Sequence, residues 1–300
     1  MDLMQWVALA VFVVTILVVI SNVVDNAVAA MIGVAVMVWI GVMSEVDAFQ
    51  YVDWNVMAIL VSIWVIAGYF GKTGVPSWLA LQALRLSGGR PGLLVMLLSM
   101  LAGVISMFVD NVVTILMMAP VALPLARALS IPITPLILMI GFSANFMGTA
   151  LLLGDLPPQM LHSVSGAEFG DFIWQFGRPS SFPILMVTFA IALGAMYAYG
   201  FRAIGRRAAS VGDVGIEAKI PDPLFATLVV GWFLLTVVGM AFREALQMKL
   251  GFIALTGAVT LVLLLELLGK RVKAPKFEEI IQELDWRAIF FYIALFALVG

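Results

Sequence analysis

The sequence lacks cysteine altogether, has a single histidine and carries little charge, and each shortage excludes a class of protein. Without cysteine the chain has no disulfides and no thiolate metal sites. Charged residues make up only 11% of the chain, against about a quarter in an average soluble domain, and no basic patch typical of a nucleic-acid-binding surface is present. Hydrophobic residues account for 63% of the 300 residues and give a mean hydropathy of +1.13. We therefore predict an all-α polytopic membrane protein.

Apolar runs long enough to cross a bilayer, about 17–25 residues each, recur along the chain. They occupy residues 4–20, 27–43, 55–70, 182–199, 223–242 and 251–268, and a last run begins at Trp286. The first run has neither a positively charged start nor a cleavage site of small residues, so we interpret it as an uncleaved helix and not as a signal peptide.

Two apolar segments in the middle of the chain carry polar, turn-forming residues. The first, residues 91–129, contains Asp110 and Asn111, and the second, residues 133–161, contains the polar stretch 143–149. Non-helical backbone at membrane depth requires protein or a wet cavity to satisfy it, and secondary transporters build their sites from such helices. We predict a re-entrant hairpin in the first segment, although two full spans fit the charge pattern equally, and a helix broken at 143–149 in the second.

Basic residues set the predicted orientation, because lysine and arginine concentrate in cytoplasmic loops. They cluster at Lys72, Arg85 and Arg90, at Arg202, Arg206 and Arg207, and at Lys270, Arg271, Lys273 and Lys276. The loop 45–53 holds only acidic charges and is predicted to be external. Residues 210–222 are predicted to form a cytoplasmic linker.

A weak internal repeat accompanies this topology. Residues 52–68, VDWNVMAILVSIWVIAG, match residues 284–300, LDWRAIFFYIALFALVG, and Gly33 aligns with Gly257. Because the two copies follow loops on opposite sides of the membrane, they are predicted to be inverted relative to each other. We expect a first repeat over residues 1–209 and a truncated, inverted second repeat over 223–300, so that the chain is a fragment of a two-repeat transporter.

Asp110 is the clearest candidate for an ion-binding residue. A carboxylate at membrane depth costs at least about 2.5–3.5 kcal/mol on insertion scales, so it normally faces a cavity or a partner. Asp110 also suits a helix N-cap, and the two roles are compatible. Asn111 and Thr114 follow as candidate ligands, although back-bonding within the helix accounts for Thr114 equally well.

The second segment supplies the other candidates. Ser143, Asn145, Gly148 and Thr149 would free backbone carbonyls for a cation, and the following half-helix would direct its N–H groups at an anion. An ordinary kink with close helix packing at Gly148 is the alternative.

Three further polar residues are expected to be structural. Asp155 precedes Pro157 and Pro158, so a cap or a position at the external interface is expected, although it completes the candidate site. His162 lies beyond the prolines, where we expect it to be solvated, and Asp25 suits a turn.

The motifs FVDNVVTILMMAPVAL, residues 108–123, and ANFMGTALLLGDLPPQ, residues 144–159, resemble those of the ion transporter superfamily. That superfamily groups arsenite-efflux permeases, sodium/proton antiporters, P-protein-like permeases, and citrate and other divalent-anion carriers. The chain departs from the pattern where Ala144 replaces a serine, Met147 a glycine and Gln159 an asparagine, where Leu151 replaces a common threonine, and where Leu156 is inserted. The resemblance implies an elevator-like or rocking carrier that forms a homodimer.

These observations predict a secondary active transporter of a small ion, either an inorganic or carboxylate anion or sodium exchanged for protons. The expected coupling ion is sodium or a proton, with no cofactor and no resident metal. The expected location is a multi-pass position in a cell membrane, bacterial and inner by family analogy. A membrane-embedded enzyme and a non-transporting scaffold subunit are the alternatives, but the sequence shows one deep acid and no cluster of catalytic side chains, so we do not expect an enzyme.

Overall fold

A computed structural model describes residues 3–202 and 220–300. Within these residues six helices are long and apolar enough to cross a membrane. They are α1 (Leu3–Ser21), α4 (Trp54–Lys72), α7 (Asn111–Ala128), α10 (Ser181–Met196) with its continuation η2 (Tyr197–Phe201), α11 (Pro223–Ala241), and α13 (Leu250–Leu268) with its continuation η4 (Gly269–Arg271). The prediction of an all-α polytopic membrane protein is therefore confirmed.

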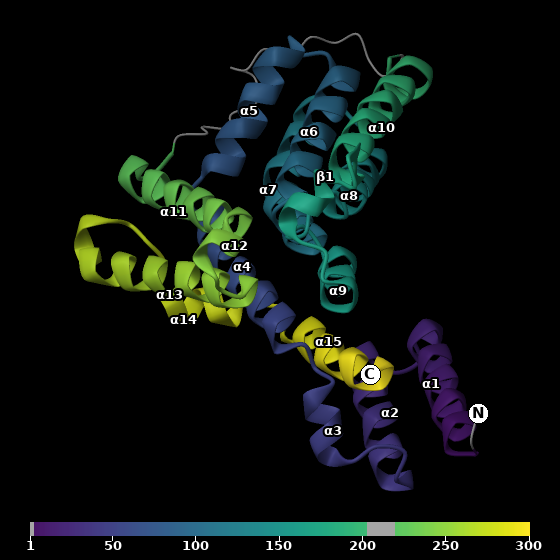
Figure 1. Cartoon of the computed structure of the whole chain (residues 1–300). Coiled ribbons are helices and arrows are strands. Elements are labelled where there is room, and N and C mark those ends of the chain that lie inside the picture. Colours follow the sequence, from purple (N-terminus) through teal and green to yellow (C-terminus); the bar gives the residue numbers. More distant parts are fainter. Residues whose placement is uncertain (1–2, 203–219) are drawn as a thin grey trace.

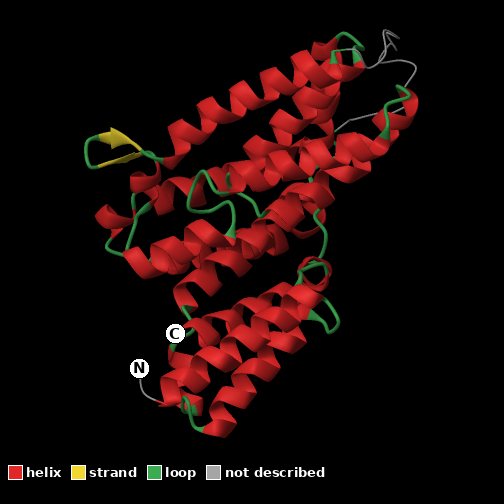
Figure 2. Cartoon of the chain, turned by 90° about the vertical axis from the view of Figure 1, so that its right-hand side faces the viewer, coloured by secondary structure: helices red, strands yellow, loops and turns green. Residues whose placement is uncertain are grey.

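Shorter elements complete the described part of the chain. The shorter apolar helices are α2 (Asn26–Ile40), α6 (Pro91–Ser106), α8 (Ile133–Gly148) and α15 (Trp286–Val299). The other helical elements are α3 (Glu45–Gln50), α5 (Val75–Ser87), α9 (Leu156–Ser165), η1 (Phe169–Phe172), α12 (Arg243–Leu246) and α14 (Phe277–Gln282). Two short antiparallel strands, β1 (Trp174–Gln175) and β2 (Arg178–Pro179), form the hairpin that projects from the helices in Figure 2.

The helices form groups that α4 connects (Figure 1). In one group α6 and α7 form a hairpin through the turn 107–110 and both pack against α8, with α5 and α10 alongside. In another, α15 packs against α2, which also contacts α1. Helix α4 runs between them and packs against α13, which in turn contacts α11.

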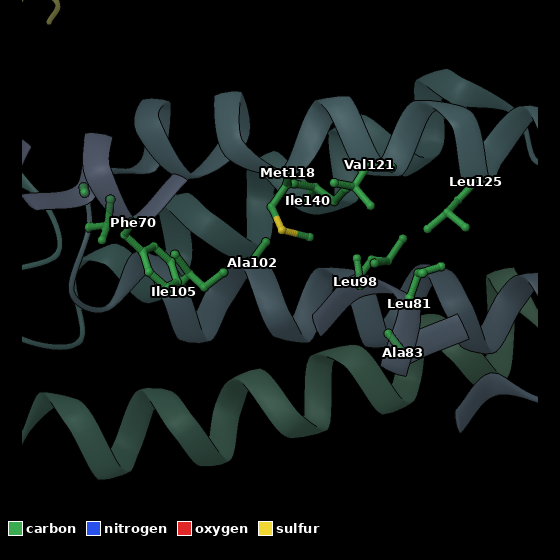
Figure 3. Packing of buried hydrophobic residues seen from close by; sticks show 14 of the residues in the cluster. Phe70, Leu81, Ala83, Leu98, Ala102, Ile105, Met118, Val121, Leu125 and Ile140 are labelled. Atoms are coloured by element: carbon green, nitrogen blue, oxygen red, sulfur yellow. The ribbon is translucent and has the colours of Figure 1, made fainter. Parts of the chain in front are cut away.

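Apolar side chains hold the first group together. Figure 3 shows Leu98 and Ala102 of α6 near Met118 and Val121 of α7, with Ile140 of α8 beside them. All five are buried. Because close-packed interiors resist volume changes and strain, this core gives the turn at 107–110 a fixed support.

The predicted position of the break in the second segment is wrong. Helix α8 continues through Gly148, and the chain leaves helical geometry only over residues 149–155 before α9 begins. Ser143, Ala144 and Met147 are buried along α8, and this packing keeps a stretch of permissive residues helical. The turn instead forms where Gly154 meets backbone atoms of Gly148, an approach that leaves no room for a Cβ.

Several contacts occur twice, at positions that the predicted repeat relates to each other. A Cβ on Gly33 would lie 2.5 Å from the Thr15 hydroxyl of α1, and a Cβ on Gly257 would collide in the same way with Thr236 of α11. Both threonine hydroxyls donate to the carbonyl four residues earlier in their own helix. The contact of α4 with α13 has its counterpart in the contact of α15 with α2.

The Asp-Trp pairs that begin α4 and α15 also adopt the same local structure. Asp53 caps α4 and Asp285 caps α15. The indole N–H of Trp54 donates to the carbonyl of Phe49 at 3.2 Å, and that of Trp286 donates to the carbonyl of Ile281 at 3.0 Å.

Two hydrogen-bonded contacts tie distant parts of the chain together. Asn55 Oδ1 accepts from the backbone N–H of Gly251 at 2.8 Å, so the start of α4 meets the start of α13. Asp222 caps α11 and accepts from the backbone N–H of Lys273 at 2.8 Å. The hydrogen bonds from Lys273, and from the first turn of α11, hold the pKa of Asp222 below its ordinary value. Most of the predicted linker 210–222 lies outside the described residues, as do the preceding Arg206 and Arg207.

Candidate functional site

Asp110 lies in the turn between α6 and α7 and begins α7. Its Oδ1 accepts from the backbone N–H groups of Val112 at 2.8 Å and Val113 at 3.4 Å, which makes it the N-cap. Only 5% of the residue is exposed. The expected cap is therefore present, and the carboxylate is buried.

Asn111 connects the two interrupted segments. Its Nδ2 donates to Asn145 Oδ1 at 3.0 Å and to Asp155 Oδ2 at 2.9 Å. These partners come from α8 and from the turn before α9. The polar positions predicted in the two segments thus face each other, although Asn145 itself lies on an exposed part of α8.

Asp155 is a buried member of the same cluster. It caps α9, with Oδ1 accepting from Leu156 N at 2.8 Å, and it is only 8% exposed. Asp155 and Asp110 line the same narrow gap. A Cβ placed on Gly148 would be 3.4 Å from the Asp155 Cβ. The expected cap is therefore present, and the turn that carries it folds back onto α6 and α8.

The remaining predicted site residues make no direct contact with the Asn111 amide. Thr114 is fully buried and donates to Val109 O at 3.3 Å, as the packing interpretation anticipated. Thr149 donates to Phe146 O at 3.0 Å and lines a separate cavity of about 270 Å³. Ser143 is buried within α8. The structure therefore brings together Asp110, Asn111, Asn145, Gly148 and Asp155.

A larger cavity leads to this cluster. It has a volume of about 630 Å³ and is lined by residues of α4, α7, α14 and α15, including Asp110 and Tyr292. Lys72 and Glu283, which also line it, form an ion pair at 2.5 Å with largely exposed side chains. The cavity thus extends from an exposed ion pair to a buried carboxylate. Sequence reasoning did not find this route, because its walls come from helices far apart in the chain.

The expectation that His162 is solvated is wrong. His162 is buried in α9, where its Nδ1 lies 2.7 Å from Ala167 O and its Nε2 lies 3.4 Å from Asn55 Nδ2. The neighbouring Ser163 hydroxyl donates to Asp53 Oδ2 at 2.5 Å. These contacts seat α9 against the start of α4, and the sequence contains no local signal for them. Within residues 3–202 and 220–300, no three His, Asp or Glu side chains gather as a metal site.

Comparison with known proteins places the chain among membrane transporters. The family profile described as "Citrate transporter" matches residues 6–300. The "46 kDa membrane protein" of Mycobacterium leprae is 26% identical over 301 residues, which cover 99% of this chain and 68% of that protein.

Two further relatives agree with the family match. An "uncharacterized transporter" of Mycobacterium tuberculosis is 29% identical over 304 residues, covering 99% of this chain and 68% of the relative. The P protein of Homo sapiens is 28% identical over 148 residues, 48% of this chain and 18% of the P protein. The chain therefore belongs to the citrate transporter family, within the superfamily that its motifs resemble, and is a multi-pass membrane transporter.

Proposed function

We propose that this protein is a secondary active transporter that moves a small anion with sodium or a proton as the coupling ion. The observation that carries the proposal is the Asn111 amide, which joins the two interrupted segments by donating to Asn145 and Asp155. Interrupted helices that meet in this way form substrate and ion sites in secondary transporters. The family match favours a carboxylate anion over an inorganic one.

The two buried carboxylates suit a cation-binding role. Asp110 and Asp155 each cap a helix, and the N-terminus of a helix favours negative charge. Their mutual proximity has the opposite effect, since two like charges in a low-dielectric site repel each other. A sodium ion or a proton bound between them removes that repulsion. Binding of the cation would therefore affect the starts of α7 and α9, which these two carboxylates cap, and the Asn111 amide that donates to Asp155.

The larger cavity has room for a small anion. Its volume of about 630 Å³ lies within the range of about 300–1,000 Å³ typical of small-ligand sites. Lys72 is the one basic side chain among the described residues that line it, and it sits at the exposed end. An incoming anion would meet Lys72 before it reaches the carboxylates.

The same proposal includes the architecture. The duplicated glycine–threonine contacts, the duplicated Asp-Trp starts and the reciprocal helix pairings support two repeats over 1–209 and 223–300. The predicted charge distribution supports their inversion. The hairpin of α6 and α7 serves as the re-entrant element. A homodimer in a bacterial inner membrane completes the proposal and rests on the family resemblance.

Transport by the intact natural protein in proteoliposomes tests the proposal. Asp110→Asn and Asn145→Ala are expected to abolish or strongly reduce ion-coupled uptake of a carboxylate such as citrate. Thr227→Ala is the matched control, because the Thr227 hydroxyl is exposed and bonds only within its own helix. Ion-coupled flux that stays at the control level in both site variants would reject the assignment.

A further inference from the structure

The projecting β-hairpin of β1 and β2 (Figure 2) has an apolar outer face and a polar inner face. Trp174 pairs with Pro179 across the ladder and Gln175 pairs with Arg178. Because directly opposed residues share a face, the first pair lies on one side of the ribbon and the second pair on the other. Trp174 is 57% exposed, whereas Gln175 is half-buried and lines the cavity of about 270 Å³ beside α9. The face of Gln175 therefore turns toward the protein, and the face of Trp174 turns away from it.

The tip of the β-hairpin exposes an aromatic side chain where the backbone disfavours one. Phe176 and Gly177 join the two strands, and both have a positive φ, +50° and +75°. Positive φ at both central residues is typical of a type I′ turn, which favours asparagine followed by glycine. A bulky residue rarely takes such a φ, yet Phe176 occupies this position with 93% of its surface exposed. The turn itself does not account for a phenylalanine here, and no described residue covers the ring.

The β-hairpin also lies at the start of a membrane-spanning helix. Only Ser180 separates β2 from α10, and a single residue reaches at most about 3.6 Å. Within α10 only Phe189 is buried. The exposed apolar residues of this helix include Ile184, Val187 and Ile191. A spanning helix that protein does not cover faces lipid, so the β-hairpin lies at the boundary between the hydrocarbon and the lipid headgroups.

We propose that this β-hairpin anchors the protein in the membrane interface, with Trp174 and Phe176 among the headgroups and Arg178 beside lipid phosphates. Aromatic residues concentrate at this level of a bilayer, and an exposed apolar patch that continues a lipid-facing surface fits a membrane. Arg178 is exposed, and a guanidinium binds phosphate well. The anchor fixes the depth at which α10 begins, and it does not depend on which ion the protein carries.

Spin-label accessibility in phosphatidylcholine vesicles, measured on the purified intact protein, tests the proposal. Residues 1–300 contain no cysteine, so Phe176→Cys introduces one labelling site among them, and the wild type measures background labelling. Collisions with oxygen, which concentrates in lipid, and with a water-soluble nickel chelate report the depth of the label. We expect a depth of roughly 5–10 Å, as for the apolar face of other interfacial segments. Ile191→Cys in α10 is the lipid reference, and Glu278→Cys on the exposed part of α14 is the matched control in water.

Quenching of tryptophan fluorescence by brominated lipids tests the native side chain. The difference between the wild type and Trp174→Phe isolates Trp174 from the other tryptophans. Bromines near the headgroups should quench Trp174 more strongly than bromines near the chain ends. Phe176→Asn supplies the residue that the turn favours, so it keeps the β-hairpin, but the quenching of Trp174, measured by the same difference, should fall because part of the anchor is lost.

Three results would overturn the proposal. Nickel accessibility at position 176 equal to that at position 278 would place the tip in water. Low accessibility to both oxygen and the nickel chelate would show that protein, such as a second copy of this chain, covers the tip. Quenching of Trp174 that is unchanged in Phe176→Asn would show that the aromatic tip does not hold the β-hairpin in the interface.

Discussion

Replacing Gly154 by alanine should disturb the candidate site through the backbone alone. A Cβ at this position would lie 2.9 Å from the Cα of Gly148 and closer still to the carbonyl oxygens of Gly148 and Ser106. Ordinary van der Waals contact begins at about 3.4 Å, so the turn 149–155 must shift by more than half an ångström. The neighbouring atoms belong to the backbones of α6 and α8, so no side chain can rotate away to relieve the clash.

We expect Gly154→Ala to lower the free energy of unfolding by about 1–3 kcal/mol, the usual cost of overpacking. For domains of 150–250 residues this corresponds to roughly 2–4 °C in Tm for each kcal/mol. Because Asp155 is the next residue, the shift should also reduce ion-coupled uptake about tenfold or more, since misplacement by 1 Å can cost about a hundredfold in a precisely arranged site.

The assays are thermal unfolding of the purified intact protein and uptake into proteoliposomes. Gly231→Ala in α11 is the matched control, because a Cβ on that helical glycine meets no atom within 4 Å. If Gly154→Ala matches Gly231→Ala in both Tm and uptake, the close-approach argument is refuted.

Three further predictions test other parts of the structure. Asn111→Leu removes the hydrogen bonds to Asn145 and Asp155, and the bond to the Asp155 carboxylate is worth about 1.5–3 kcal/mol. The Tm and the ion-coupled uptake of this variant should therefore both fall. Wild-type values of both would contradict the bridging role of Asn111. Lys72→Gln should change the unfolding free energy by no more than about 1 kcal/mol, since its ion pair with Glu283 is exposed, but should raise the KM for the anion; an unchanged KM would exclude Lys72 from the route. Gly257→Ala should be destabilising, and Thr236→Ala in the same chain should recover part of the loss, because it removes the two nearest atoms; a double-mutant cycle with no coupling would oppose the packing explanation.

Sequence patterns predicted the elements and part of the cluster. Asn111 and Asn145 stood out because polar residues are costly within apolar runs, and the Asn111 amide donates to Asn145 and to Asp155. The helix break was misplaced because backbone permissiveness alone does not decide where a helix ends. Packing keeps residues 143–148 helical, and the turn forms only where Gly154 allows close approach.

The remaining differences arise from contacts between distant segments. His162 follows two prolines, which suggested an exposed loop, yet it is buried because α9 meets Asn55 at the start of α4. Trp64 lies in an apolar run and looks like any lipid-facing or core residue. It lines both the larger cavity and the narrow gap because of how α4 packs against the turn before α9, which no single stretch of sequence encodes.

The junction of α4 with α13 has a mechanical consequence. A Cβ on Gly251 would lie 2.9 Å from Asn55 Oδ1 and closer still to the Asn55 carbonyl, and the Gly251 N–H is bonded to that same side chain. The backbones of α4 and α13 are therefore in close contact at this point, and no side chain of Gly251 separates them. Because α4 and α13 also pack against each other beyond this point, we expect them to move as one unit in any rearrangement of the protein.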